Sequence, residues 1–403
     1  MITKKIFNDT ETAFRLKSDS ELNRAIFLFE MIDRPLLVKA GTAATKAALT
    51  LHLPVESLIK KTIFNQFCGG VTEKDCMPVI QKMYSKHLHS ILDYSVEGKE
   101  KESEFEKAIE RKTNIVHFIE DKEAIPFAVF KPTAIGRFEI WQKVSANANL
   151  SLEEEEEWQR IKNRVNKICD AAYNANVRLL ADAEESWMQD AADVLMEEMM
   201  FKYNRERAII YNTLQCYRWD RLQYLKDLHS RAIDQGFIVG AKIVRGAYLE
   251  KENERAAKMG YLSPICENKE ATDVNFNGAL TYCLAHIDEI SVFIGTHNEV
   301  SNYLALQVME DKGIAKDDDR VWFSQLFGMS EHISYNLAEE GYNVAKLVPF
   351  GPVREVVPYL IRRAEENTSV KGQTGRELAL LYEERKRRGG EITKSNRESE
   401  LAS

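Results

Sequence analysis

The sequence has no cysteine arrangement that would predict a disulfide framework or a zinc site. Its six cysteines are widely scattered and none forms a CxxC pair; they are Cys68, Cys76, Cys169, Cys216, Cys266 and Cys283. Disulfide-stabilised small domains and zinc ribbons depend on closely spaced cysteines, so both classes are excluded. Scattered thiols are typical of a protein from a reducing compartment.

Long hydrophobic runs are also lacking. No apolar stretch reaches the roughly 18–20 residues that a membrane-spanning helix requires. The N-terminal stretch MITKKIFNDTETAF has no apolar signal-peptide core, and its acidic residues are untypical of a transit peptide. We therefore expect a cytoplasmic protein, with peripheral attachment to the inner face of the cytoplasmic membrane as the other option.

Positive charge is in deficit, and the common nucleotide motifs are missing. The formal net charge is −8, and no basic stripe interleaved with aromatic residues occurs, so we expect no nucleic-acid partner. Neither GxGxxG nor GxxxxGK[ST] is found. A dinucleotide cofactor, if bound, is therefore not held by a Rossmann fingerprint or a P-loop.

The chain does contain eight short, nearly continuous apolar runs separated by helical stretches. They span residues 89–97, 126–132, 177–184, 208–215, 237–246, 290–298, 320–328 and 343–351. Such runs are typical of strands buried on both faces of a parallel sheet. Eight strands alternating with helices predict an α/β fold, a (β/α)8 TIM barrel. Alternation alone leaves a doubly wound sheet as an alternative.

Residues outside these runs predict the domain organisation. Residues 1–85 read as an N-terminal helical arm, in which Ser18 is positioned to cap the helix that begins at Glu21. Residues 86–388 form the barrel, and the polar residues 389–403 form a tail that we expect to be disordered. Ser151 and Glu154 form a capping box, which predicts a helix running to about Ala175.

Polar residues gather where the predicted strands end, which is where barrel enzymes place their active sites. They are Asp93, Glu97, Lys131, Asp182, Glu184, Gln215, Lys242, Arg245, Thr296, His297, Asn298 and Gln325. A buried Lys131 or Lys242 is costly without a partner, so several charged strand ends together indicate a site. His297 has no second histidine or cysteine nearby in the sequence, and we expect no metal.

A short amphipathic helix around residues 359–367 follows Gly351 and Pro352. Tyr359 and Arg362 are three residues apart, as are Arg363 and Glu366, so each pair shares a helix face. Guanidinium groups bind carboxylates bidentately, and these arginines suit a small carboxylate. A solvated Arg/Glu surface is the alternative for this helix taken alone. Together with Lys131, Lys242 and Arg245, the arginines predict a cationic rim that binds anions.

Several segments, in this order, are similar to one known family. They are LDYSVEG (92–98), the Lys131 strand, LLADAEES (179–186), YNTLQCY (211–217), AKIVRGAYLEKE (241–252), GTHN (295–298), QLFGMS (325–330) and PYLIRRAEENTS (358–369). The chain resembles the proline dehydrogenase family from about residue 89 to residue 381. RGAY and YLIRRAEEN are the strongest of these matches.

The resemblance implies a distorted (β/α)8 barrel that holds FAD at its C-terminal face. It implies oxidation of L-proline to 1-pyrroline-5-carboxylate, by hydride transfer to the flavin N5, as the first step of proline catabolism. Electrons would pass to a membrane quinone. The product would pass to a separate pyrroline-5-carboxylate dehydrogenase, because we expect this chain to be too short to contain that enzyme as well.

The resemblance also implies roles for individual residues. Lys131, Arg362 and Arg363 match ligands of the proline carboxylate, and Tyr359 and Leu360 match residues beside the pyrrolidine ring. Asp182 matches an active-site acid that orients Lys131 or the arginines, and Lys242 matches a cation near the reactive edge of the flavin. Contacts to FAD are implied for Gln215, Lys242, Arg245, Gly246, Ala247, Thr296, His297 and Asn298.

One position departs from the family pattern, and other functions stay open. Leu347 stands where many relatives carry a tyrosine against the proline ring, so hydroxyproline is an alternative substrate. From the residues alone, a (β/α)8 aldolase with Lys131 or Lys242 as a Schiff-base lysine is a rival. A folate-reductase-like flavin barrel and an inert scaffold are further alternatives.

Overall fold

The computed structural model describes residues 5–51, 53–95, 101–369 and 373–390. Glu97 and residues 391–403, most of the predicted tail, lie outside this part of the chain. Side chains of residues 365–369 also lie outside it, including that of Glu366.

Eight parallel strands close into a barrel in which each strand pairs with the next and β8 pairs with β1. The strands are β1 (His89–Tyr94), β2 (Phe127–Phe130), β3 (Arg178–Ala181), β4 (Ile210–Gln215), β5 (Val239–Val244), β6 (Ile290–Gly295), β7 (Val321–Leu326) and β8 (Val344–Phe350). All eight predicted runs contain a strand, and the predicted (β/α)8 barrel is confirmed. A closed barrel excludes the doubly wound alternative.

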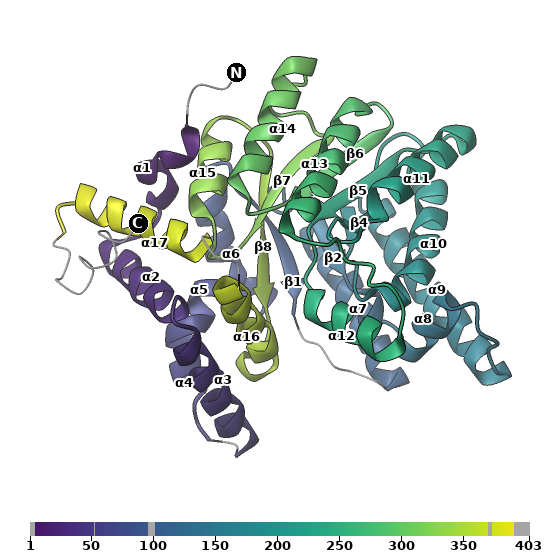
Figure 1. Ribbon diagram of the computed structural model, residues 1–403, viewed down its shortest axis with the longest axis horizontal. Coiled ribbons are helices and arrows are strands. Elements are labelled where there is room, and N and C mark those ends of the chain that lie inside the picture. The colour runs from purple at the N-terminus through teal and green to yellow at the C-terminus, as the bar shows by residue number, and fades with distance from the viewer. Residues whose placement is uncertain (1–4, 52, 96–100, 370–372, 391–403) are drawn as a thin grey trace.

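Helices surround the barrel (Figure 1). They are α7 (Glu102–Ile119), α8 (Phe138–Ser145), α9 (Leu152–Asn174), α10 (Ser186–Tyr203), α11 (Arg221–Gln235), α12 (Leu249–Met259), α13 (Lys269–Ala285), α14 (Glu299–Lys312) and α15 (Glu331–Glu339). The Ser151–Glu154 capping box opens α9 as predicted. Short 3-10 turns, η1 (Ile6–Asn8) and η3 (Pro132–Ala134), complete the connections.

The N-terminal residues fold into a row of helices. These are α1 (Thr10–Phe14), α2 (Asp19–Ile32), α3 (Pro35–Thr50), α4 (Glu56–Ile59), the π-helical turn η2 (Lys60–Phe64), α5 (Asn65–Phe67) and α6 (Glu73–Tyr84). Ser18 caps α2 through a capping box with Glu21, as expected. The C-terminal helix α17 (Gln373–Arg387) packs on α2 and α1, where Leu380 and Leu381 join a core with Phe14 and Leu22. In Figure 1 the yellow and purple ends of the chain therefore lie side by side. The division at residue 85 remains a prediction.

Alternation along the strands separates the barrel interior into layers. Side chains at every second position point inward, and Phe127, Tyr211, Phe293 and Trp322 form an apolar cluster there. Their rings pack edge to face, for example Phe127 on Trp322 with centroids 5.2 Å apart. Above this aromatic layer, nearer the carboxyl ends of the strands, the inward positions include the charged residues Asp93 and Lys242.

Helix α16 (Val353–Ser369) follows β8 at the carboxyl end of the barrel (Figure 1). Pro352 directly precedes its first residue, where a fixed φ favours helix initiation. The helix is longer than the predicted short segment and continues through Pro358. Its residues Val356 and Leu360 share a buried cluster with Phe64 and Phe67. The N-terminal helices thus brace α16 over the barrel.

Candidate active site

Lys242 and Asp182 form an ion pair at the carboxyl end of the barrel interior. Lys242 Nζ on β5 donates a hydrogen bond to Asp182 Oδ1, just past β3, at 2.5 Å. The side chains are only 11% and 17% exposed, so little water screens the pair. The Asp182 carboxylate accepts this hydrogen bond from Lys242. The expectation that Asp182 orients Lys131 or the arginines stays a prediction.

A second charged group lies on the β1 and β2 side of the same layer. Asp93 near the end of β1 accepts a hydrogen bond from Ser95 Oγ at 2.7 Å and lies 3.5 Å from Lys112 Nζ of α7. Burial lowers the pKa of the Lys112 ammonium, Asp93 opposes that shift, and the charges of Lys131 and Asp182 also act on Lys112. The structure therefore brings together Asp93, Lys112, Lys131 and Asp182 around one end of the barrel.

Sequence analysis missed Lys112. The signal was present, because the buried face of α7 includes Ile109, Lys112, Ile115 and Val116, so the lysine lies on the apolar stripe. A lysine on such a stripe needs a partner inside the fold.

Glu184, just past β3, is fixed against the segment that follows β2. Its carboxylate accepts hydrogen bonds from Thr133 N at 2.9 Å and Thr133 Oγ1 at 2.7 Å. Burial raises the pKa of Glu184 to about 7, and the charge of Lys131 limits that rise. The Thr133 contacts therefore hold a carboxyl group that changes protonation near neutral pH.

Helix α16 carries four of the predicted substrate residues. Tyr359 and Leu360 are buried, while Arg362 and Arg363 are half-buried. The Arg363 guanidinium lies over the Tyr359 ring, with Cζ 5.2 Å from its centroid. The predicted Arg363–Glu366 pair lies outside the described side chains.

His297, after β6, is held by two hydrogen bonds and feels the charge of Arg363 on α16. Its Nδ1 pairs with Ser330 Oγ at 2.9 Å, and Leu326 N donates to its Nε2 at 3.4 Å. Burial is the largest cause that lowers the pKa of His297 to about 3, and the charges of Lys346 and Arg363 act in the same direction. His297 is therefore neutral at physiological pH and carries no charge toward Arg363.

Arg245 is held rigidly between the ends of β5 and β6. Its Nε donates to Asp273 Oδ1 at 2.8 Å, its Nη1 to Thr296 Oγ1 at 2.8 Å and its Nη2 to Ser301 Oγ at 2.9 Å. Asn298, also predicted as a ligand contact, caps α14 by accepting from Ser301 N at 3.0 Å. These contacts fix the conformation of the segment after β6.

Gly246 continues the chain after Arg245 with φ +134°, a conformation that side chains rarely adopt. A Cβ at this position would lie 2.5 Å from the Tyr217 ring. Gly246 and Ala247 are both exposed, so their backbone is accessible to a ligand.

Gln215, at the end of β4, presents an unsatisfied acceptor. Its Nε2 donates to Ala183 O at 3.3 Å, while its Oε1 is buried and has no hydrogen-bond partner within the described residues. A buried carbonyl without a donor is costly, and a bound ligand with an N–H group would satisfy it. The site thus offers cations for an anionic ligand and an acceptor for an amide-like ligand.

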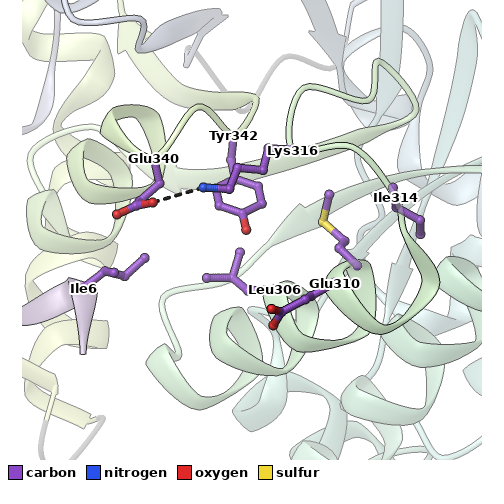
Figure 2. Close-up of a pocket in the computed structure, with 8 residues that line it drawn as sticks. Ile6, Leu306, Glu310, Ile314, Lys316, Glu340 and Tyr342 are labelled. Carbon is purple, nitrogen blue, oxygen red and sulfur yellow. Dashed lines mark hydrogen bonds and ion pairs between the residues drawn. The ribbon is translucent and has the colours of Figure 1, made fainter. Parts of the chain in front are cut away.

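A surface hollow of about 280 Å³ lies elsewhere, between α14 and the segments that lead into β7 and β8. Figure 2 shows Leu306 and Tyr342 lining it beside the Lys316–Glu340 ion pair, whose atoms are 3.0 Å apart. These residues precede β7 and β8, so the hollow belongs to the amino end of the barrel, away from the charged layer.

Among the described residues, no helix is both long and apolar enough to span a membrane.

Comparison with known proteins places the chain in a family. The family model described as Proline dehydrogenase matches residues 76–376. The chain is 34% identical to the carbapenem antibiotics biosynthesis protein CarD of Pectobacterium carotovorum subsp. carotovorum, over 80% of this chain and 83% of that protein. It is 30% identical to hydroxyproline dehydrogenase of Xenopus laevis, over 93% of this chain and 88% of that protein.

Two other similar proteins are much longer than the part of them that matches this chain. Identity to the mitochondrial proline dehydrogenase 1 of Homo sapiens is 42%, over 59% of this chain and 40% of that protein. The structure of proline utilization A (PutA) from Bdellovibrio bacteriovorus, inactivated by N-propargylglycine, superposes with a TM-score of 0.70 at 20% identity. That superposition covers 93% of this chain and 38% of the PutA chain and concerns the fold. The chain thus spans less than half the length of these two proteins. The family match over most of its length shows that the chain belongs to the proline dehydrogenase family, a family of oxidoreductases.

Proposed function

We propose that the chain oxidises L-proline to 1-pyrroline-5-carboxylate with bound FAD. The observation that carries the proposal is the buried Lys242–Asp182 pair at the carboxyl end of the barrel. The two arginines of α16, the helix that follows β8, would complete the site. The family match supports the reaction, and the charge pattern of the site supports a small amino acid as its substrate.

The cations of the site would bind the substrate carboxylate. Arg362 and Arg363 can each form bidentate contacts, and Lys131, just past β2, supplies a third positive charge. Tyr359 and Leu360 are buried beside Arg363 and would form an apolar wall against the pyrrolidine ring. Holding the carboxylate on one side and the ring on the other would fix the ring carbon next to nitrogen.

The residues at the ends of β4, β5 and β6 suit FAD. The unsatisfied Oε1 of Gln215 would accept the imide N–H of the flavin ring, while the exposed backbone of Gly246 and Ala247 allows close approach. Arg245, Thr296, His297 and Asn298 would line the same side. When bound, FAD supplies the hydride acceptor for the reaction.

Lys242 would act as a fixed positive charge in this reaction. Asp182 accepts its hydrogen bond and keeps the ammonium at one place in the barrel. A preorganised cation stabilises negative charge that develops during reaction without first having to reorient. Asp182 would thereby affect the reaction in two ways, by holding Lys242 in place and through its own negative charge.

We propose further that the enzyme passes electrons to a quinone and works at a membrane surface. Leucines and a phenylalanine on the N-terminal helices are exposed: Leu36 by 82%, Leu58 by 66% and Phe27 by 56%. Exposed apolar side chains on helices suit insertion into a lipid interface. The product would pass to a separate pyrroline-5-carboxylate dehydrogenase.

A second candidate is the oxidation of hydroxyproline. Leu347 on β8 is half-buried beside the aromatic layer and carries no hydroxyl group. A relative that matches most of this chain is a hydroxyproline dehydrogenase. A smaller aliphatic side chain at this position leaves space for a substituent on the ring.

The decisive test is the visible spectrum of the purified protein, recorded anaerobically before and after adding L-proline. Bleaching of a flavin spectrum by proline is the expected result. Bleaching by trans-4-hydroxy-L-proline but not by proline would favour the second candidate. The absence of flavin even after adding FAD would contradict both, and borohydride trapping would then test the Schiff-base aldolase.

A further inference from the structure

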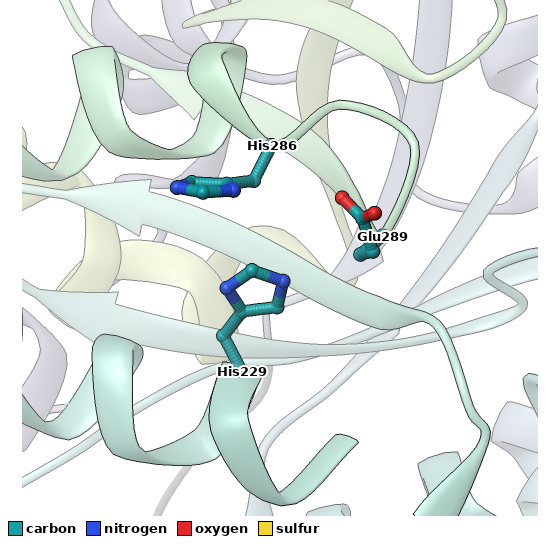
Figure 3. A group of neighbouring side chains, drawn as sticks. All are labelled: His229, His286 and Glu289. Carbon is teal, nitrogen blue, oxygen red and sulfur yellow. The ribbon is translucent and has the colours of Figure 1, made fainter. Parts of the chain in front are cut away.

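Two histidines and a glutamate meet at the amino end of the barrel, on the side opposite the candidate active site. His229 lies on α11, His286 directly follows α13, and Glu289 directly precedes β6. One ligand atom from each lies within 4.8 Å of those of the other two. Figure 3 shows the His286 ring lying over a tilted His229 ring, with the Glu289 carboxylate beside them.

His229 has an unmet hydrogen-bonding atom in this cluster. The residue is 3% exposed, and its Nδ1 pairs with the Tyr282 hydroxyl at 2.9 Å. Its Nε2 is buried without a hydrogen-bond partner among the residues that the structure describes. The unpartnered Nε2 is therefore the atom that would coordinate a metal ion.

Aromatic packing alone accounts for only part of this arrangement. The His229 and His286 rings pack with centroids 4.8 Å apart, and Tyr282 packs on His286 at 4.5 Å. Packing explains why the rings are close. It leaves the His229 Nε2 without a partner, and it gives no reason for a carboxylate to stand beside two imidazoles.

We propose that His229, His286 and Glu289 bind one Zn²⁺ ion, with water completing the coordination. Two imidazoles and one carboxylate are ligands that zinc accepts, whereas Mg²⁺ and Ca²⁺ prefer oxygen ligands throughout. Zinc–ligand distances of about 2.0–2.2 Å bring the ligand atoms to roughly 3.3 Å from one another. Each ligand atom therefore moves about 1 Å toward the ion, a distance that small side-chain rotations allow.

Tyr282 would orient the ligand. If its hydroxyl accepts the proton of Nδ1, the lone pair of His229 Nε2 is directed at the ion. Lys226 lies with its Nζ 5.8 Å from the face of the Tyr282 ring, and Asp288 pairs with Arg320 at 2.8 Å, so neither charge is a ligand in this arrangement.

The site would tie α11 to the connection between α13 and β6. The amino end of a (β/α)8 barrel generally carries stability and not catalysis. The sequence does not predict this site, because His229 and His286 are far apart along the chain, separated by β5 and two helices. The bound ion is expected to raise the thermal stability of the barrel and to leave proline oxidation unchanged.

The test uses the full-length flavin-loaded protein without a polyhistidine tag, stripped with EDTA and titrated with ZnCl₂ against a chromophoric chelator. We expect one Zn²⁺ per chain and a higher Tm. His286→Ala and Glu289→Gln should each weaken binding at least about 100-fold, and Tyr282→Phe about tenfold. The matched control is His117→Ala, whose side chain is 57% exposed and remote from the cluster.

Cobalt provides a second measurement, because Co²⁺ bound by imidazoles in a four- or five-coordinate site absorbs visible light. A Co²⁺ absorption band in wild type and in His117→Ala, absent in His286→Ala, would support the site. Zinc binding that is equal in wild type, His286→Ala and Glu289→Gln would overturn it, as would no micromolar binding in wild type. Because the readouts are metal content and Tm, they are independent of whether the chain oxidises proline.

Discussion

Lys242 and Asp182 meet across the carboxyl end of the barrel, with the Nζ and Oδ1 atoms 2.5 Å apart. The two residues come from β5 and from the end of β3, so the strand of β4 lies between them in the barrel wall. The pair belongs to the charged layer that lies above the aromatic side chains of the barrel interior.

Lys242→Met should leave the Asp182 carboxylate without its hydrogen-bond donor. We expect a loss of about 1–3 kcal/mol in the free energy of unfolding, below the range for fully buried pairs because both side chains retain some exposure. Urea denaturation of Lys242→Met, Asp182→Asn and the double variant measures the coupling. The double variant should lose less than the sum of the single variants; simple additivity would show that the pair is not coupled.

Arg362→Ala and Arg363→Ala should weaken proline binding while the protein stays yellow. Loss of a charge-assisted contact of about 1.5–3 kcal/mol raises KM roughly 10- to 100-fold. Steady-state kinetics and the flavin absorbance give the two readouts. Arg354→Ala is the matched control, because Arg354 lies on the same helix, pairs with Glu56 and should not affect KM. Loss of flavin in both α16 variants would contradict the assignment of these arginines to the substrate.

Leu347→Tyr should shift the substrate preference toward proline. The larger aromatic side chain fills space beside the ring and adds a hydroxyl to the wall. The ratio of kcat/KM for L-proline to that for trans-4-hydroxy-L-proline measures the effect. A ratio equal to that of the wild type would mean that this position does not form the pocket.

Gly246→Ala should damage both stability and flavin retention. A Cβ at this position would lie 2.5 Å from the Tyr217 ring, and the backbone has φ +134°. We expect a cost of about 1–3 kcal/mol from overpacking and backbone strain. Gly41→Ala is the control, because no atom lies within 4 Å of its Cβ position and alanine favours a helix. Equal Tm values for the two variants would refute the steric argument.

Glu184 should make stability depend on pH between its two pKa values. Its ordinary pKa is 4.5, and burial raises the pKa in the folded protein to about 7. Between these values the folded state keeps a proton that the unfolded state has lost, so stability falls as pH rises. The contribution is fully present below 4.5 and is lost as pH passes about 7.

Glu184→Gln removes this titration, since the amide does not ionise. The free energy of unfolding of the variant, relative to wild type, should therefore increase from pH 5 to pH 8. Chemical denaturation at a series of pH values measures the difference. A constant difference across this range would show that Glu184 titrates with its ordinary pKa.

The barrel was predictable because eight buried parallel strands require nearly continuous apolar runs. The predicted runs were too long where polar residues follow the strand, as at Ser95 after β1 and Asp182 after β3. Those polar residues begin the loops that carry the candidate site. The same residues that indicated the site were therefore counted as part of the strands, which made the predicted strands too long.

Contacts from outside the strands were harder to predict. Lys112 reaches Asp93 from α7, and no local pattern names its partner, although its place on an apolar stripe shows that it needs one. His229 and His286 come together only because α11 and α13 are neighbours around the barrel. The charges on α16 were identified from motifs, while the length of the helix depends on its packing against Phe64 and Phe67.

The cluster that joins Phe14 and Leu22 to Leu380 and Leu381 has a consequence for biosynthesis. During translation α1 and α2 leave the ribosome long before α17. The surface that Phe14 and Leu22 bury with Leu380 and Leu381 has no partner until residues 373–387 have emerged. Contacts of such large sequence separation form late and slow folding. A nascent chain of this protein should therefore need protection by chaperones at α1 and α2 until α17 has been made.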